Sequence, residues 1–352
     1  MRRWIAMGLL FGCGGGDGPA EVVDAAGDSI EDVAVDSAAV DSAGGSDSAI
    51  DTAVLGDTAG SSDTGASSDT GTTSDTGTTS DTGTATDTGI ADAPGDAGGL
   101  AASSDEFGSA STLSSFGDLY PSRHSILDIG ATTPGALTLA PTLALHTTWY
   151  SDDYGPLLYK NVSTDFVVET AVVVTRIGSS AAPSGNFNQA GLFVRDPATS
   201  YPGNARWLMY NVGHQDGRLA REAKWTRPAT SGASLSTLYL NDTPGGSLTV
   251  QLRICRVGGT FHFFHRHPSE SALVEEAFVT STTRVNGNGA GVATPGVSSS
   301  GGPLRFTVPM ASAVQVGLMV GTWEPPHDVK GTFDYVRFSA VSSYAECTKA
   351  LP

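Results

Sequence analysis

Residues 247–257 read Ser-Leu-Thr-Val-Gln-Leu-Arg-Ile-Cys-Arg-Val. Apolar and polar side chains alternate along this stretch, which is the period of a β-strand buried on one face. The side chains that would share the buried face are Leu248, Val250, Leu252 and Ile254. Residues 165–177 are instead rich in β-branched residues and apolar on both faces. That composition predicts a central strand of a sandwich.

Further strand signals lie on both sides of these two segments, separated by clusters of Gly, Pro and Asn. We expect strands at 157–161, 189–195, 206–212, 259–266, 304–308, 313–321 and 331–341. Amphipathic helical periodicity is scarce, and its best candidate is 269–278. Residues 286–302 lack periodicity and are predicted to form an exposed loop. The pattern predicts an all-β, two-sheet sandwich over residues 105–352.

The charge of the chain is unevenly placed. The 352 residues contain 37 Asp and Glu against 19 Lys and Arg, and residues 1–100 hold 18 of the acids but two of the bases. Residues 101–352 are therefore close to neutral, which argues against binding to nucleic acid. Beyond the short N-terminal stretch, no segment approaches the ~20 apolar residues of a membrane-spanning helix.

The N-terminus has the order of a secretory signal. Two arginines precede an apolar run that ends at Gly12 and Cys13. Leu10-Phe11-Gly12-Cys13 resembles a bacterial lipobox, in which the cysteine is lipidated and becomes the new N-terminus. Gly14 stands where many inner-membrane lipoproteins have Asp. Residues 1–13 are therefore predicted to be a lipoprotein signal peptide that leads to the outer membrane or the cell exterior. The alternative is an ordinary start with a free cysteine.

Residues 14–104 consist mostly of Asp, Ser, Thr, Gly and Ala, and we predict a disordered acidic linker. Asp-Thr recurs every six residues from Asp57 to Asp87. Asp-Thr-Gly is also the aspartic-protease triplet, but the apolar strands that flank it in those enzymes are absent here. The aspartates are too sparse for a tight calcium loop. A spacer that extends by charge repulsion is the preferred interpretation, with O-glycosylation left open.

Several motifs of the body occur in the order of a known group. They are Trp149-Tyr150, Leu157-Leu158-Tyr159, Asp165-Phe166, Gln189-Ala-Gly-Leu-Phe-Val-Arg195, Trp207, Gln315–Met319 and Phe333–Phe338. Over about residues 145–340 the chain is similar to the DUF1349 group of the concanavalin A-like lectin/glucanase superfamily. The resemblance implies a jelly-roll sandwich and a general leaning toward glycan binding. Because the function of that group is largely unassigned, the resemblance supplies no catalytic residue.

Aromatic side chains suit a sugar site because they cover the apolar face of a pyranose, while planar polar groups bind its hydroxyls. Tyr154 and Trp323 stand in loop contexts, which favours recognition. Trp207 and Asn211 would share one strand face, although Trp207 could equally be core. The predicted carbohydrate-binding residues are Tyr154, Trp323, Trp207, Asn211 and Asp153.

Other chemistry has weaker signals. Glycoside hydrolysis needs two carboxylates about 5–10 Å apart, and the chain lacks the Glu-x-Asp-x-x-Glu strand motif of hydrolases in that superfamily. His265 and His267 could start a metal site, but a third ligand is not visible. A structural calcium, as in sandwich lectins, could use Asp334 or Asp165. No required cofactor is expected.

Cys255 and Cys347 can pair if the protein is exported, and the alternative is two separate buried thiols. The sequence as a whole favours a non-catalytic, lectin-like surface lipoprotein whose partner is a glycan or polysaccharide. A structural or protein-interaction module at the cell envelope and a divergent glycoside hydrolase remain the alternatives.

Overall fold

The computed structural model describes residues 99–352, apart from 144–145, 200–201 and 299–300. The predicted signal peptide, Cys13 and the hexad repeats lie outside the described residues. In the described part the chain is all-β, with strands joined by loops and short 3₁₀ helices, and the predicted fold class is confirmed. No helix in that part is long and apolar enough to cross a membrane.

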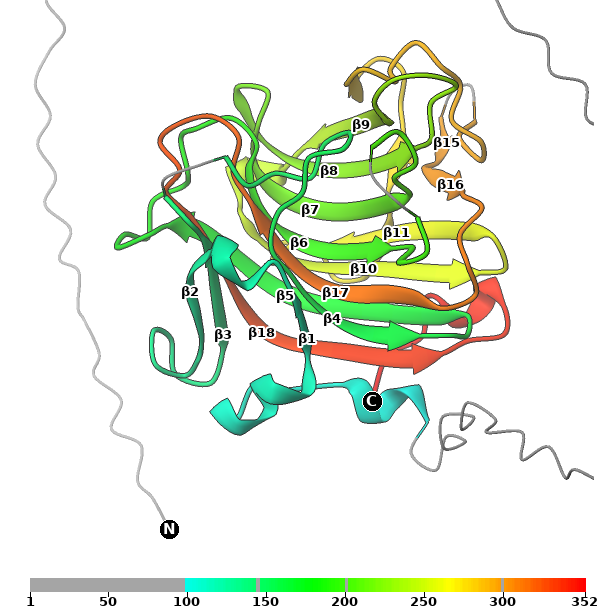
Figure 1. Ribbon diagram of the computed structural model, residues 1–352. Helices are drawn as coiled ribbons and strands as arrows, with labels where there is room; N and C mark the ends of the chain where they lie inside the picture. Colours follow the sequence, from blue (N-terminus) through cyan, green and yellow to red (C-terminus); the bar gives the residue numbers. More distant parts are fainter. Residues whose placement is uncertain (1–98, 144–145, 200–201, 299–300) are drawn as a thin grey trace, which may run out of the picture. The chain divides into compact units, whose positions relative to one another are not determined.

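The first sheet, called sheet I, has eight antiparallel strands. In spatial order they are β1 (Gly117–Leu119), β4 (Leu157–Val162), β17 (Val314–Gly321), β6 (Asn188–Arg195), β7 (Trp207–Gln215), β8 (Arg218–Arg227), β9 (Leu235–Asp242) and β14 (Arg284–Asn286). Figure 1 shows this series of strands in front of β10 and β11 of the second sheet.

The second sheet, sheet II, packs behind sheet I. Its path is β12 (Val274–Glu275), β11 (Thr260–Arg266), β10 (Thr249–Val257), β5 (Phe166–Arg176), β18 (Val329–Ala340), β3 (Leu137–Pro141) and β2 (His124–Ile129), and β16 (Arg305–Thr307) also pairs with β11. The short strands β13 (Ala277–Phe278) and β15 (Gly302–Pro303) pair with each other. The 3₁₀ helices are η1 (Leu100–Ser103), η2 (Ala110–Ser115), η3 (Pro121–Arg123), η4 (Pro244–Gly246) and η5 (Tyr344–Glu346).

The main core lies between the sheets and bears out the sequence pattern. The apolar residues that alternate along 247–257, namely Leu248, Val250, Leu252 and Ile254, are all buried in this core. As predicted, β5 is a central strand, and it lies between β10 and β18. The structure corrects two expectations about the elements. Residues 269–278 contain β12 and β13 rather than a helix, and the strands β8 and β9 were not predicted. The folded part also begins slightly before residue 105, because η1 packs against β18 and the Ser104 hydroxyl accepts a hydrogen bond from the Phe338 N–H at 2.9 Å.

The outer face of sheet I carries a second apolar cluster, formed by Trp149, Leu157, Phe193, Ala205, Trp207, Met209 and Met319. On this face the strands approach one another closely at glycine positions. A Cβ on Gly317 would meet the carbonyl oxygen of Leu158 and lie 2.7 Å from the Cα of Tyr159. Glycine at this position therefore lets β17 and β4 pack at a spacing that a larger residue would disturb.

The outer face of sheet II is covered at one end by the C-terminal segment. Cys347 forms a disulfide with Cys255 of β10, a state typical of proteins outside the cytoplasm. The buried Arg253 pairs with Glu169 and donates to the carbonyl oxygens of Cys347 and Lys349 at 2.6 and 2.8 Å. Covalent and ionic contacts thus hold the segment on the sheet together.

Replacing Gly317 by Ala should destabilise the fold by about 1–3 kcal/mol, because the added methyl group would push against the backbone of β4. Urea denaturation followed by circular dichroism measures the change. Gly259→Ala is the matched control, since a Cβ at that position meets no atom within 4 Å. Equal stability of the two variants would contradict the close approach of β17 and β4.

Candidate functional site

A pocket of about 220 Å³ opens on the outer face of sheet I, beside the second apolar cluster. β8 contributes Lys224 and β9 contributes Leu238 to it, while loops and the β14 edge supply the walls. The residues around the opening are Thr148, Tyr150, Phe187, Asn286, Gly287 and Trp323. The pocket therefore combines three aromatic side chains with an ammonium and an amide group.

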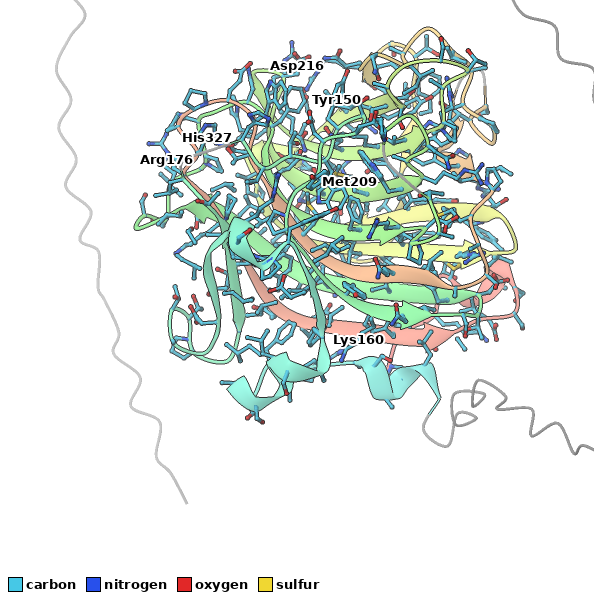
Figure 2. All side chains as sticks on the ribbon, viewed as in Figure 1. Tyr150, Lys160, Arg176, Met209, Asp216 and His327 are labelled. Carbon is cyan, nitrogen blue, oxygen red and sulfur yellow. A yellow bond between two sulfur atoms is a disulfide. The ribbon has the colours of Figure 1, made fainter. Side chains whose placement is uncertain are left out.

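Two aromatic rings line the pocket in fixed positions. The ring centroids of Tyr150 and Trp323 are 6.3 Å apart at an interplanar angle of 48°. The Tyr150 hydroxyl accepts a hydrogen bond from the Asn288 N–H at 2.8 Å, and the backbone of Tyr150 bridges to Asp153. Trp323 contacts the His146 ring and is 38 % exposed. In Figure 2 the labelled Tyr150 lies near the loops at the edge of sheet I, away from Met209 on β7.

Strained backbone accompanies the aromatic wall. Phe187, which lines the pocket, has a φ of 54°, and Ser151, next to Tyr150, also has a φ of 54°. Such left-handed conformations are uncommon for residues other than glycine, and they concentrate where surrounding structure holds a functional site in shape. Gly287, which also lines the pocket, has a φ of 99°, which glycine adopts freely.

The floor of the pocket holds a buried ion pair. The Lys224 ammonium lies 3.1 Å from a carboxylate oxygen of Glu222 and donates to the carbonyl oxygen of Trp149 at 2.9 Å. Both side chains are almost completely buried. Burial lowers the pKa of Lys224, and the charge of Glu222 partly offsets that effect. Since an unpaired charge at such depth would be costly, the pair constrains the local structure.

The predicted sugar-binding residues are distributed over three environments. Trp323 lines the pocket. Asp153 is exposed and its N–H donates to the Tyr150 carbonyl oxygen at 2.8 Å. Tyr154 is stacked on Tyr120 with ring centroids 4.2 Å apart and packs against the second apolar cluster, away from the pocket lining. Trp323 is thus the predicted residue that the structure places at the opening.

The other two predicted residues are fully buried, which corrects their assignment as direct sugar contacts. Trp207 stacks on Phe193 with ring centroids 5.4 Å apart, so it belongs to the second apolar cluster. Asn211 donates to a Glu222 oxygen at 3.3 Å. Asn211 therefore belongs to the polar layer of the floor rather than to the surface.

Sequence reasoning missed most of the floor and one wall. Lys224 and Glu222 lie on β8, whose charged residues break the apolar pattern by which a strand is predicted. Nothing in the sequence singles out Phe187. The available signal was the run of charged residues at 218–227, which lies between two turn regions. A strand can bury such charges only when they form ion pairs.

The predicted metal ligands do not come together. Val341 donates its N–H to the Asp165 carbonyl oxygen, and Asp334 lies seven residues earlier along the chain, which corresponds to about 20 Å on a strand. The Asp165 carboxylate already accepts from the Gly258 N–H at 2.7 Å. The two carboxylates therefore lie apart, and a calcium site that uses either one of them stays a prediction. Among the described residues there is no group of three or more His, Cys, Asp or Glu placed to hold a metal ion.

His265 and His267 belong to a buried polar cluster between the sheets. Its centre is Glu276, whose carboxylate receives the Tyr210 hydroxyl and the Arg221 guanidinium, with Arg221 Nε at 2.8 Å. His265 Nδ1 lies 3.2 Å from Glu276, and Arg221 Nη1 lies 2.8 Å from His267 Nε2. Burial alone would raise the pKa of Glu276, but the charge of Arg221 and the surrounding hydrogen bonds hold it well below its usual value.

Asp242 on β9 lacks the raised pKa that a general acid for glycoside hydrolysis needs. Asp242 follows Leu240, the partner of Glu222, along β9. Partial burial raises the pKa of Asp242, but Arg284 and Arg218, bound at 2.5 and 3.2 Å, outweigh it and lower the pKa overall. A general acid needs the opposite shift.

Protonation of His267 should destabilise the protein in mild acid. Burial and then the neighbouring Arg221 charge lower the pKa of His267 from 6.5 to about 4. Between these values the unfolded chain binds more protons than the folded one. The contribution of neutral His267 to stability is therefore fully present above pH 6.5 and is lost as the pH falls toward 4.

Urea denaturation at several pH values should therefore give a free energy of unfolding that rises with pH across this window. The slope should correspond to a difference of up to about one bound proton between the unfolded and folded chains. The variant His267→Gln should have a flatter profile there. Glu276 adds a further loss below its ordinary value of 4.5, which the variant retains. Identical slopes for wild type and variant between pH 4 and 6.5 would contradict this assignment.

No family model matches the chain, so the likeness to the DUF1349 group remains unsupported, and no curated protein matches. A functionally unknown protein from Saccharomyces cerevisiae is 16 % identical, with 66 % of this chain and 99 % of that chain covered and a TM-score of 0.42. Bacteroides ovatus xyloglucan PUL GH43B is 12 % identical, with 68 % of this chain and 39 % of that chain covered and a TM-score of 0.40. Lectin I of Ulex europaeus, complexed with the methyl glycoside of α-L-fucose, is 10 % identical, with 63 % of this chain and 90 % of that chain covered and a TM-score of 0.33. The description of this chain as a two-sheet sandwich follows from its own strand pairing.

Proposed function

We propose that this domain binds carbohydrate without catalysis, in the pocket between Tyr150 and Trp323. The observation that supports the proposal is a pair of fixed aromatic rings beside a floor of buried polar groups. A pyranose has an apolar face and a hydroxyl-bearing edge, and this pocket offers complementary surfaces to both.

The size of the pocket limits the ligand. Sites for drug-sized molecules measure about 300–1,000 Å³. A volume of about 220 Å³ suits one small ring, such as the terminal unit of a glycan. The Asn286 amide at the wall and the Lys224 ammonium at the floor supply the hydrogen-bonding groups that orient such a ring.

We further propose that the protein is a lipoprotein of a bacterial cell envelope. Cys13 would carry the lipid, and the acidic residues 14–104 would hold the domain away from the membrane surface. The disulfide between Cys255 and Cys347 is consistent with an extracytoplasmic location. In that setting the ligand would be a glycan or polysaccharide at the cell surface.

Trp323→Ala and Tyr150→Ala should each weaken glycan binding at least about tenfold, since each removes one of the rings that would stack on the sugar. A glycan and polysaccharide array, probed with the full chain with and without calcium, identifies the ligand. Calorimetry then measures the affinities of the variants.

Tyr344→Ala is the matched control, because Tyr344 is also a partly exposed aromatic residue but lies on η5, outside the pocket lining. It should bind normally. Tyr154→Ala should reduce thermal stability and leave affinity unchanged, since its ring packs on Tyr120. Absence of binding to every glycan, in either calcium condition, would reject this function in favour of a structural or protein-interaction module.

A further inference from the structure

Three accessible side chains of the pocket have hydrogen-bond donors that the protein leaves unused. Tyr150 is half-buried, whereas Asn286 and Trp323 are exposed, and all three line the pocket. Among the described residues, nothing accepts a hydrogen bond from the Tyr150 hydroxyl, the Asn286 amide or the Trp323 indole N–H. We call these three groups the donor set. Because the three side chains reach solvent, a ligand in the pocket can contact them.

Neighbouring backbone groups decide which atoms of the donor set remain free. The Gly287 N–H donates to Asn286 Oδ1 at 2.7 Å, so the amide oxygen is engaged and the NH₂ group is left over. The Asn288 N–H donates to the Tyr150 hydroxyl oxygen at 2.8 Å, which leaves the hydroxyl proton to be donated. The indole nitrogen of Trp323 can only donate. The donor set therefore calls for an acceptor on the ligand.

The pocket offers no unpaired charge to an ionic ligand. Of the described residues that line it, none has a carboxylate side chain, and the charge of Lys224 is already neutralised by Glu222 at 3.1 Å. An ionised carboxylate or sulfate on the ligand would give up its hydration without meeting a free cation, which is unfavourable. An ammonium group would instead set a further donor against the donor set. The donor set accordingly suits a neutral acceptor, such as a carbonyl oxygen.

Apolar surface accompanies the donor set in the same pocket. Phe187 and Leu238 line it together with the rings of Tyr150 and Trp323. The hydroxyl groups of a plain hexose can accept from the donor set, but they leave this apolar surface uncovered. An N-acetyl group has both a carbonyl oxygen, which accepts hydrogen bonds, and a methyl group, whose burial against apolar side chains is favourable. It therefore matches the two kinds of surface that the pocket combines.

We infer that this pocket takes sugars that carry an N-acetyl group. The acetamido carbonyl oxygen accepts from the donor set, and the methyl group packs against the apolar lining beside it. The ligand class is accordingly the 2-acetamido sugars, in preference to plain hexoses, free amino sugars and uronic acids. This inference rests on the proposed function, to which it adds the identity of the sugar substituent.

Matched sugars test the inference with the full chain. In each of the gluco, galacto and manno series, the methyl glycosides of the hexose, the 2-amino sugar, the 2-acetamido sugar and the uronic acid share one ring configuration. Calorimetry at pH 7 should show that the acetamido sugar of the binding series binds about tenfold more tightly than the other three. If any of those three binds as tightly as the acetamido sugar, the inference is overturned and the proposed function stands. Absence of binding in every series also overturns the inference, and the glycan array then decides the proposed function separately.

A pair of variants tests the donor set itself. Asn286→Asp keeps the oxygen that accepts from the Gly287 N–H but replaces the NH₂ donor by a second, charged acceptor. It should weaken binding of the acetamido sugar about tenfold and strengthen binding of the amino sugar, which reverses the preference. Asn161→Asp is the matched control, because it makes the same charge change at an exposed position of β4, outside the pocket lining. Its preference should equal that of wild type. With both variants folded by circular dichroism, an unchanged preference in Asn286→Asp would overturn the role of the donor set.

Discussion

The pairing of the charges on β8 is the constraint on which the rest of sheet I depends. β8 lies inside the sheet, between β7 and β9, and both of its faces are covered. Arg221 points to the interior and meets Glu276, whereas Glu222 and Lys224 point to the outer face and meet each other. Removing one partner of such a pair leaves an uncompensated buried charge, at a cost of about 3–5 kcal/mol. The strand can therefore occupy this position only in the register that makes both pairings.

The two pairings together position the proposed pocket. The inner one fixes Glu276, whose backbone N–H and carbonyl oxygen also bond to Phe263 and Leu304, each at 2.7 Å. From this anchor the chain continues to β14, which pairs with β9 and brings Asn286 to the pocket wall. The outer pairing sets the Lys224 ammonium at the floor. A single strand thus determines the floor directly and one wall through the segment that Glu276 holds.

Sequence periodicity predicted the elements whose burial depends on apolar side chains. Residues 247–257 and 165–177 became strands because their apolar positions face a core, and this pattern is visible without knowledge of partners. β8 was not predicted because several of its buried positions carry charged side chains. The ion pair of Arg221 with the distant Glu276 cannot be read from the sequence of the strand itself. The predicted helix at 269–278 failed for the same reason. Its Glu276 serves as an ion-pair partner between the sheets instead of occupying a solvated helix face.

The composition of β7 explains why a pocket forms at one part of sheet I and why one loop aromatic became exposed and another did not. Trp207 and Met209, toward the start of the strand, are apolar, so covering segments that include Tyr154 pack on them and form the second apolar cluster. Asn211 and Gln215, further along, offer a covering loop little apolar surface to bury, and burial of such groups is favourable only when they are hydrogen-bonded. The change from apolar to polar side chains along one strand therefore separates the covered part of the sheet from the part beside the opening. Trp323 and Tyr154 look alike in sequence, and this boundary, which only the folded sheet defines, gives them different environments.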